Sequence, residues 1–290
     1  MRLGVHVSIA GGLLEAVARA KRLRCTTMQI FSRSPRGGRV LPLDPRIVQR
    51  FDQERRAAGI DPLAVHGPYI LNLASPDTGL WTRFATLYAE EYRRATQLRA
   101  QYLVTHVGSH RGEGESAGIR RVAEAVSLAL ATRSDVIILL ENTAGSGQGL
   151  GYQFEQLAQI RELVKGQERV GVCLDTAHLF AAGYAIHTAD GLEQTLTAFD
   201  QVVGADQLKL IHLNDSKVPF QARVDRHWHI GEGQIGFEAF RRIVTHPRVR
   251  SLPLILETPK DTEAEDQRNL ATVRRLAQSP DPENACHATN

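Results

Sequence analysis

The sequence predicts an α/β protein built as a single (β/α)8 barrel, and three observations support this. Eight short apolar runs recur along the chain, amphipathic segments lie between them, and metal-ligand residues stand at the ends of most runs. The runs are aliphatic and bounded by polar residues or glycine, which is typical of buried parallel strands. They cover residues 3–7, 26–31, 63–66, 102–106, 136–141, 170–175, 208–212 and 252–257. Eight is the number of strands that a closed parallel barrel requires.

The segments between the runs predict helices, because their apolar residues recur at spacings of three and four. They cover residues 13–23, 44–59, 80–98, 116–133, 154–166, 191–204, 236–247 and 264–278. Alternating strands and right-handed crossovers give the TIM-barrel fold, whose chemistry lies at the carboxyl ends of the strands. With 290 residues, 42% of them hydrophobic, one domain over residues 1–278 suffices. The polar tail over 279–290 is predicted to be disordered.

Six of the runs end on a histidine or a carboxylate. These residues are His66, His106, Glu141, Asp175, His212 and Glu257. The string DTAH adds His178, and DRHWH adds Asp225 and His227. Any one of them alone would more often be a structural residue at a strand end, but six such endings together are hard to reconcile with chance. One metal ion takes three or four protein ligands, so these nine residues predict more than one ion.

Composition narrows the cellular setting. The amino terminus lacks a signal-peptide core, and no apolar run reaches the roughly 20 residues needed to cross a bilayer. The three cysteines have no metal-type spacing, which favours a reduced compartment. We therefore expect a cytoplasmic protein with no membrane partner. A net charge of +3 is weak evidence for nucleic acid, but bound divalent ions would add positive charge where phosphate binds.

Longer motifs carry a family resemblance. The strings HGPYILNLASP, THVGSH, LENTAG, CLDTAHLFAAGY, IHLNDSK, VDRHWHIGEGQIG and ETP occur in this order. They resemble the endonuclease IV family of apurinic/apyrimidinic DNA endonucleases, from GVHVSIAGG to the last helix. The resemblance implies a three-zinc hydrolase that cuts double-stranded DNA on the 5′ side of an abasic site and leaves a 3′-hydroxyl. It also implies cleaning of blocked 3′ ends.

The resemblance further implies how the nine ligands are shared. The first zinc would take His66, His106 and Glu141, and Glu141 would bridge to the second. The second would also take Asp175, His212 and Glu257, and the third His178, Asp225 and His227. Manganese is an alternative ion at one or more sites, since it accepts the same ligands.

The expected chemistry follows from such a cluster. Two ions that share a carboxylate can hold a hydroxide, because coordination lowers the pKa of water from about 16 to near 7. This hydroxide would attack phosphorus, while a third ion would neutralise the departing 3′ oxygen. Either Glu257 or Glu141 would orient or deprotonate the water, and the sequence leaves both open.

Two loops are implied to contact DNA. Arg33, Arg36 and Arg39 lie in SRSPRGGR after the second run, where they are expected to project from the active-site face, and Tyr69 and Ile70 follow His66. Family members insert side chains from the corresponding loops into the DNA minor groove. Gly37 and Gly38 occupy positions that usually carry larger side chains, which predicts a weaker wedge.

Two other functions stay open. A divalent-metal sugar isomerase of similar fold would use a smaller, carboxylate-rich cluster, whereas five histidines and the DRH motif favour the nuclease. A binding protein with structural zinc would close each coordination shell with Cys or His. The expected state is a monomer without an obligate protein partner.

Overall fold

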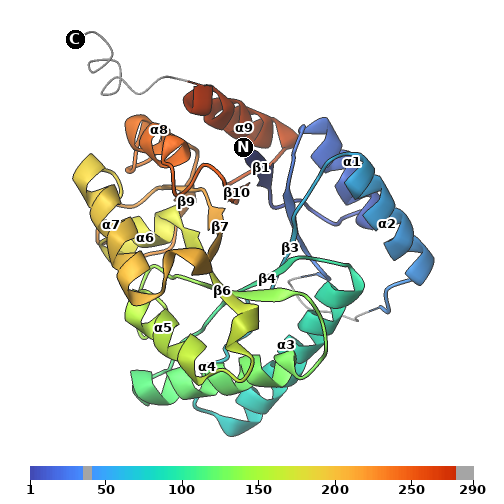
Figure 1. The fold of residues 1–290 in the computed structure, drawn as a ribbon, viewed down its shortest axis with the longest axis vertical. Helices are drawn as coiled ribbons and strands as arrows, with labels where there is room; N and C mark the ends of the chain where they lie inside the picture. Colours follow the sequence, from blue (N-terminus) through green and yellow to red (C-terminus); the bar gives the residue numbers. More distant parts are fainter. Residues whose placement is uncertain (35–40, 279–290) are drawn as a thin grey trace.

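The computed structural model describes residues 1–34 and 41–278, and its centre is a nearly closed barrel of eight parallel strands (Figure 1). Around the barrel the strand order is β1-β10-β7-β6-β5-β4-β3-β2. The strands are β1 (Arg2–Val5), β2 (Met28–Phe31), β3 (Leu63–His66), β4 (Tyr102–His106), β5 (Ile137–Glu141), β6 (Val170–Asp175), β7 (Leu208–His212) and β10 (Pro253–Leu256). Each lies within one of the eight runs, apart from one residue at the start of β1, so the predicted fold class is confirmed.

The barrel closes between β1 and β2 through few contacts. A single bridge pairs His6 with Gln29, and the backbone N–H of Val7 donates to the carbonyl of Gln29 at 2.7 Å. Gly4 allows this close approach, because a Cβ at that position would lie 1.9 Å from the carbonyl oxygen of Thr27. The closure therefore depends on a residue without a side chain.

Helices form the outer ring in Figure 1. They are α1 (Leu13–Arg22), α2 (Pro45–Ala57), α3 (Thr78–Gln97), α4 (Glu115–Leu130), α5 (Phe154–Leu163), α7 (Ala189–Val202), α8 (Phe237–Thr245) and α9 (Glu263–Gln278), all at predicted positions. The ring closes where α9 lies beside α1, and there Arg22 forms a 2.7 Å ion pair with Glu263. None of the helices in the described ranges is long and apolar enough to cross a membrane.

A small apolar layer lies inside the barrel. Its residues are Ala64, Val104, Leu139, Cys173, Leu210 and Ile255, one from each of six strands. Side chains alternate between the two faces of a strand, so the residue two positions later also points inward. In all six cases that residue is one of the ligand residues at the run ends. The apolar layer is therefore the floor on which the six side chains stand.

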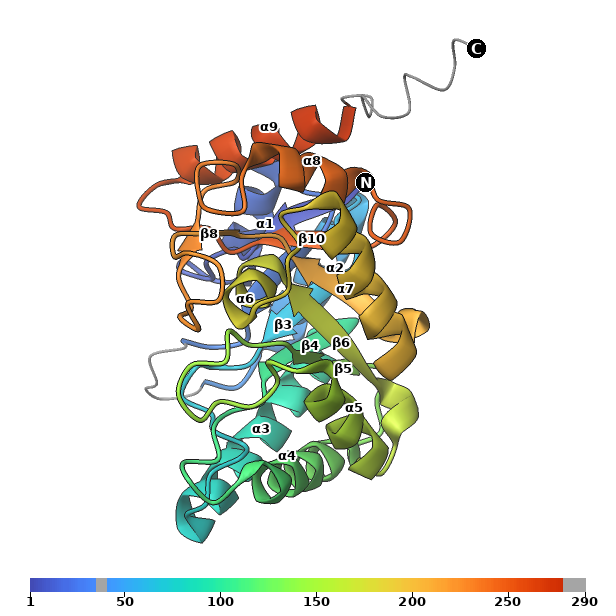
Figure 2. The same ribbon diagram turned by 90° about the vertical axis from the view of Figure 1, so that its left-hand side faces the viewer.

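Two features beside the barrel were not predicted. Helix α6 (Thr176–Ala182) begins directly after β6, and the short strands β8 (Asp215–Ser216) and β9 (His227–Trp228) pair in an antiparallel fashion. Figure 2 shows α6 and β8 at the end of the barrel toward which the arrow of β6 points. Both features carry ligand residues, since α6 contains His178 and β9 contains His227.

Replacing Gly4 by alanine tests the barrel closure. The new methyl group would collide with the Thr27 carbonyl and push β1 from β2, at a cost of about 1–3 kcal/mol in the free energy of unfolding. Gly79→Ala is the matched control, because its Cβ would meet only Asp77 at an ordinary 3.4 Å within α3. Denaturant unfolding measures both variants. Equal stability of the two would show that the close approach does not limit closure.

Candidate metal centre

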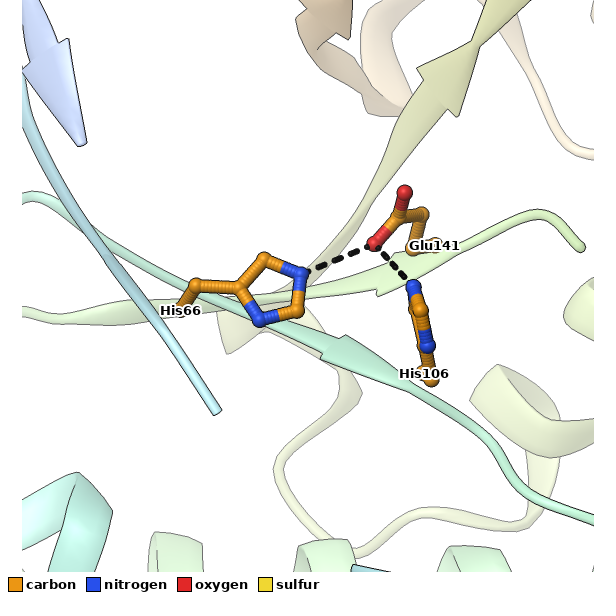
Figure 3. Close-up of side chains that lie close together, drawn as sticks. All are labelled: His66, His106 and Glu141. Carbon is orange, nitrogen blue, oxygen red and sulfur yellow. Dashed lines mark hydrogen bonds and ion pairs between the residues drawn. The ribbon is translucent and has the colours of Figure 1, made fainter. Parts of the chain in front are cut away.

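The ligand residues of the strand ends gather into three groups. These are His66, His106 and Glu141; Glu141, Asp175, His212 and Glu257; and Asp175, His178 and His227, the ligand atoms of each group lying within 4.8 Å of one another. Figure 3 shows the first group, with the rings of His66 and His106 directed at one carboxylate. Glu141 belongs to two groups, as a bridging ligand would.

Glu141 is the centre of the cluster and is fully buried. Its Oε2 lies 3.1 Å from Nε2 of His66 and 3.0 Å from Nε2 of His106, and its Oε1 lies 2.9 Å from Nδ1 of His212. Burial alone would raise the pKa of this carboxyl group, but His106 and His212 hold it well below its usual value. Glu141 is therefore ionised at neutral pH.

Backbone carbonyls orient three of the five histidines. Nδ1 of His66 lies 2.7 Å from the oxygen of Gly67, Nδ1 of His178 lies 2.9 Å from that of Asn142, and Nδ1 of His227 lies 3.2 Å from that of Glu257. A carbonyl only accepts, so each Nδ1 carries a proton and each ring directs its Nε2 inward.

These inward Nε2 atoms face one another or a carboxylate. The Nε2 atoms of His178 and His227 lie 3.4 Å apart, and Nε2 of His66 faces the Glu141 carboxylate. Such pairs repel unless a proton or a metal ion lies between them. Nitrogen and oxygen donors in this proportion suit zinc, so the residues present fit the metal expected from the sequence.

Two asparagines hold Asp175 in the cluster. The Asn142 side chain accepts from the backbone N–H of Asp175 at 2.6 Å, and the Asn214 amide donates to the Asp175 carboxylate at 2.7 Å. The carbonyl of the Asn214 side chain also accepts from the backbone of Glu257 at 2.7 Å. Sequence reasoning gave neither residue a role. Their positions could have indicated a role near the metal, because Asn142 directly follows Glu141 and Asn214 follows His212 by two residues.

The third group differs in detail from the expected set. Asp175, rather than Asp225, completes the group with His178 and His227. Asp225 still lies 3.2 Å from Nε2 of His178 and 3.4 Å from Nε2 of His227, with 49% of its side chain exposed. Burial opposes ionisation of Asp225, but His178 and His227 lower its pKa to about 2. Asp225 is thus an ionised carboxylate at the open side of the group.

A cleft of about 340 Å³ opens beside the cluster. Tyr69, Ile70, His106, His178 and Asp225 are among its lining residues. Tyr69 and Ile70 are 67% and 60% exposed, and Phe31 packs edge-on behind Tyr69 with ring centroids 5.2 Å apart. Both residues expected to insert into DNA therefore stand exposed at the mouth of the ligand cluster.

One prediction for the arginine-rich segment SRSPRGGR was wrong. Arg33 was expected to project from the active-site face, but its Nε lies 2.5 Å from buried Glu91 of α3, and only 13% of its side chain is exposed. Its guanidinium group is thus occupied within the protein, and a contact with DNA stays a prediction. Arg36 and Arg39, with Gly37 and Gly38, lie outside the described residues.

Fold and site together define a TIM barrel with clustered metal-ligand side chains at the carboxyl ends of its strands. The model of the xylose isomerase-like TIM barrel family matches residues 17–278. A protein of Chloroflexus aurantiacus named probable endonuclease 4 is 45% identical over 280 residues, which cover 96% of this chain and 98% of that protein.

Solved structures show the same relationship. The crystal structure of endonuclease IV from Thermus thermophilus superposes with a TM-score of 0.85 at 37% identity, covering 95% of this chain and 98% of that one. A D-tagatose 3-epimerase-like protein superposes with a TM-score of 0.70 at 16% identity over 100% of both chains, which shows a shared fold alone. The chain belongs to the endonuclease IV family.

Zinc binding is expected to release protons. Burial alone would lower the pKa of His178, but Asp175 and Asp225 raise it to about 10, so without a metal the ring is protonated at pH 7. A zinc ion must displace this proton, and zinc affinity should therefore rise with pH up to about 10. Calorimetric titration in buffers of different ionisation enthalpy measures the release, which should reach at least about one proton per chain. A binding enthalpy that did not depend on the buffer would contradict it.

Proposed function

We propose that this protein is a DNA repair endonuclease that hydrolyses the phosphodiester bond 5′ to an abasic site and leaves a 3′-hydroxyl. The proposal depends above all on one observation: imidazole nitrogens and ionised carboxylates converge at the carboxyl ends of the strands, close enough to share bound cations. Membership of the endonuclease IV family supports the choice of substrate. Cleaning of blocked 3′ ends belongs to the same proposal, since it also breaks a phosphodiester bond.

Three zinc ions per chain are proposed as the cofactor. His66, His106 and Glu141 would hold the first, Asp175, His212 and Glu257 with Glu141 the second, and His178, Asp225 and His227 the third. Manganese is proposed as an alternative at one or more of these positions. Bound zinc ions would polarise the scissile phosphate, lower the pKa of water and neutralise charge on the leaving oxygen.

The chain's own carboxylates would handle the proton of the attacking water. Glu257 is only 16% exposed, and its Oε2 lies 3.2 Å from His212 while its Oε1 accepts from Gln29. Burial alone would raise the pKa of the Glu257 carboxyl group, but its neighbours, chiefly His212, hold it well below its usual value. An ionised, fixed carboxylate at the rim of the cluster suits a base that orients water. Glu141 is enclosed by histidines, so we assign this role to Glu257 and bridging to Glu141.

Duplex DNA is the proposed partner, with Tyr69 and Ile70 as the side chains that enter it. Large apolar side chains exposed beside a cluster of cations suit the insertion of a wedge next to the bound phosphate. We further propose that the protein acts in the cytoplasm as a monomer without an obligate protein partner.

Incision of a defined duplex tests the function. A labelled duplex with one stable abasic-site analogue should be cut on the 5′ side of the lesion, leaving a 3′-hydroxyl, and the undamaged duplex is the control. Gel analysis identifies the ends of the product, and metal analysis of the same preparation should give about three ions per chain. An intact strand together with interconversion of an aldose and a ketose would support the sugar isomerase instead.

Glu257→Gln tests the assigned base. The amide cannot accept a proton from water, so turnover should fall by at least about 100-fold. DNA binding should persist, because Tyr69, Ile70 and the remaining ligands are unchanged. Glu263→Gln, at an exposed position of α9, is the matched control and should cut at the normal rate. Single-turnover incision and a DNA-binding titration give the two readouts, and near-normal cutting by Glu257→Gln would rule out the role.

A further inference from the structure

Gln29 is a buried amide inside the barrel that is not one of the nine ligand residues. It lies on β2, is 0% exposed, and reaches two members of the second ligand group at once. Its Nε2 lies 2.6 Å from Oε1 of Glu257, and its Oε1 lies 2.9 Å from Nε2 of His212. The second group of ligands therefore has a shared neighbour on a strand that supplies none of the ligands.

The orientation of this amide follows from its partners. An ionised carboxylate can only accept, so the NH2 group of Gln29 must face Glu257. The amide oxygen then faces His212, and Nε2 of His212 must carry the ring proton. Nδ1 is then the ring nitrogen that a metal ion can bind, and it faces Glu141 at 2.9 Å and Glu257 at 3.2 Å.

This arrangement makes His212 different from His66, His178 and His227. Those three rings carry their proton on Nδ1, opposite a backbone carbonyl, and direct Nε2 inward. His212 carries its proton on Nε2 and directs Nδ1 inward, and its orienting acceptor belongs to a side chain. Substitution can remove that acceptor without disturbing the backbone.

We propose that Gln29 is a positioning residue that fixes the tautomer of His212 and the orientation of Glu257 for the second metal ion. The inference rests on the proposed metal centre and names the residue on which that ion's affinity depends. Mutation of a residue that hydrogen-bonds a metal ligand typically lowers metal affinity or activity by about 10- to 100-fold. His6, whose Nδ1 lies 2.9 Å from Nε2 of Gln29, completes the enclosure of the amide.

Two variants separate hydrogen bonding from packing. Gln29→Met keeps the approximate volume but removes donor and acceptor, and it should weaken one of three zinc-binding steps by about 10- to 100-fold. Gln29→Glu retains an acceptor for His212 but loses the donor to Glu257 and adds a like charge beside it, so it should recover only part of the lost affinity. Gln101→Met is the control, because Gln101 accepts from the backbone of Leu63 at the opposite end of β3. It should bind zinc as the wild type does.

Competition with a chelator measures each zinc-binding step. Unchanged affinity in Gln29→Met would overturn the role of Gln29, while normal zinc binding by the wild type would leave the metal centre standing. If the wild-type protein bound no zinc, both the role of Gln29 and the proposed metal centre would be overturned.

A spectroscopic readout needs only wild-type protein. Long-range ¹H–¹⁵N spectra of the zinc-loaded protein should show His212 protonated on Nε2, with His66, His178 and His227 protonated on Nδ1. A His212 ring protonated on Nδ1 would overturn the proposal whether or not the variants fold.

Discussion

The buried carboxylate of Glu141 is the constraint on which the arrangement of the site depends. An ionised group without solvent exposure is very costly unless several partners compensate it. Three histidines from β3, β4 and β7 do so, and these strands are separated by long stretches of sequence. Their ends must therefore meet above the same apolar floor. The parallel register achieves this, since it pairs His106 with Glu141 and Asp175 with His212 at one level.

The strand period explains why so much of the site could be predicted from the sequence. A ligand that ends a buried strand stands two residues after a floor residue, as Leu139 precedes Glu141 and Leu210 precedes His212. A shift of one residue would turn each ligand out of the barrel. The position at which each apolar run ends therefore predicts which side chain points into the barrel. Six side chains that meet in space can be found in this way.

Residues that act between strands could not be found in this way. Gln29 and Asn214 look like ordinary polar residues until the fold brings them against Glu257 and Asp175. Helix α6 was overlooked because it is short and its N-cap is Asp175, whose Oδ1 accepts from the backbone of His178. Arg33 was expected to be free because its partner Glu91 lies on α3, far along the chain. Each of these depends on a contact that no local pattern encodes.

The site divides into a rigid part and a more open part, and this division has a physical origin. Glu141 and His212 stand on strands, fully buried, while hydrogen bonds from neighbouring segments fix their surroundings. Asp225 instead stands on the loop between β8 and β9, half exposed, and the loop is held by a bond from Ser146 to the carbonyl of Arg223. Orienting bonds to carbonyl groups preorganise the rings, so that Nε2 atoms and carboxylates lie close together and share protons in the metal-free protein. Because a bound cation replaces those protons only in the folded state, metal affinity becomes folding stability, most of all where the ligands cannot relax into solvent.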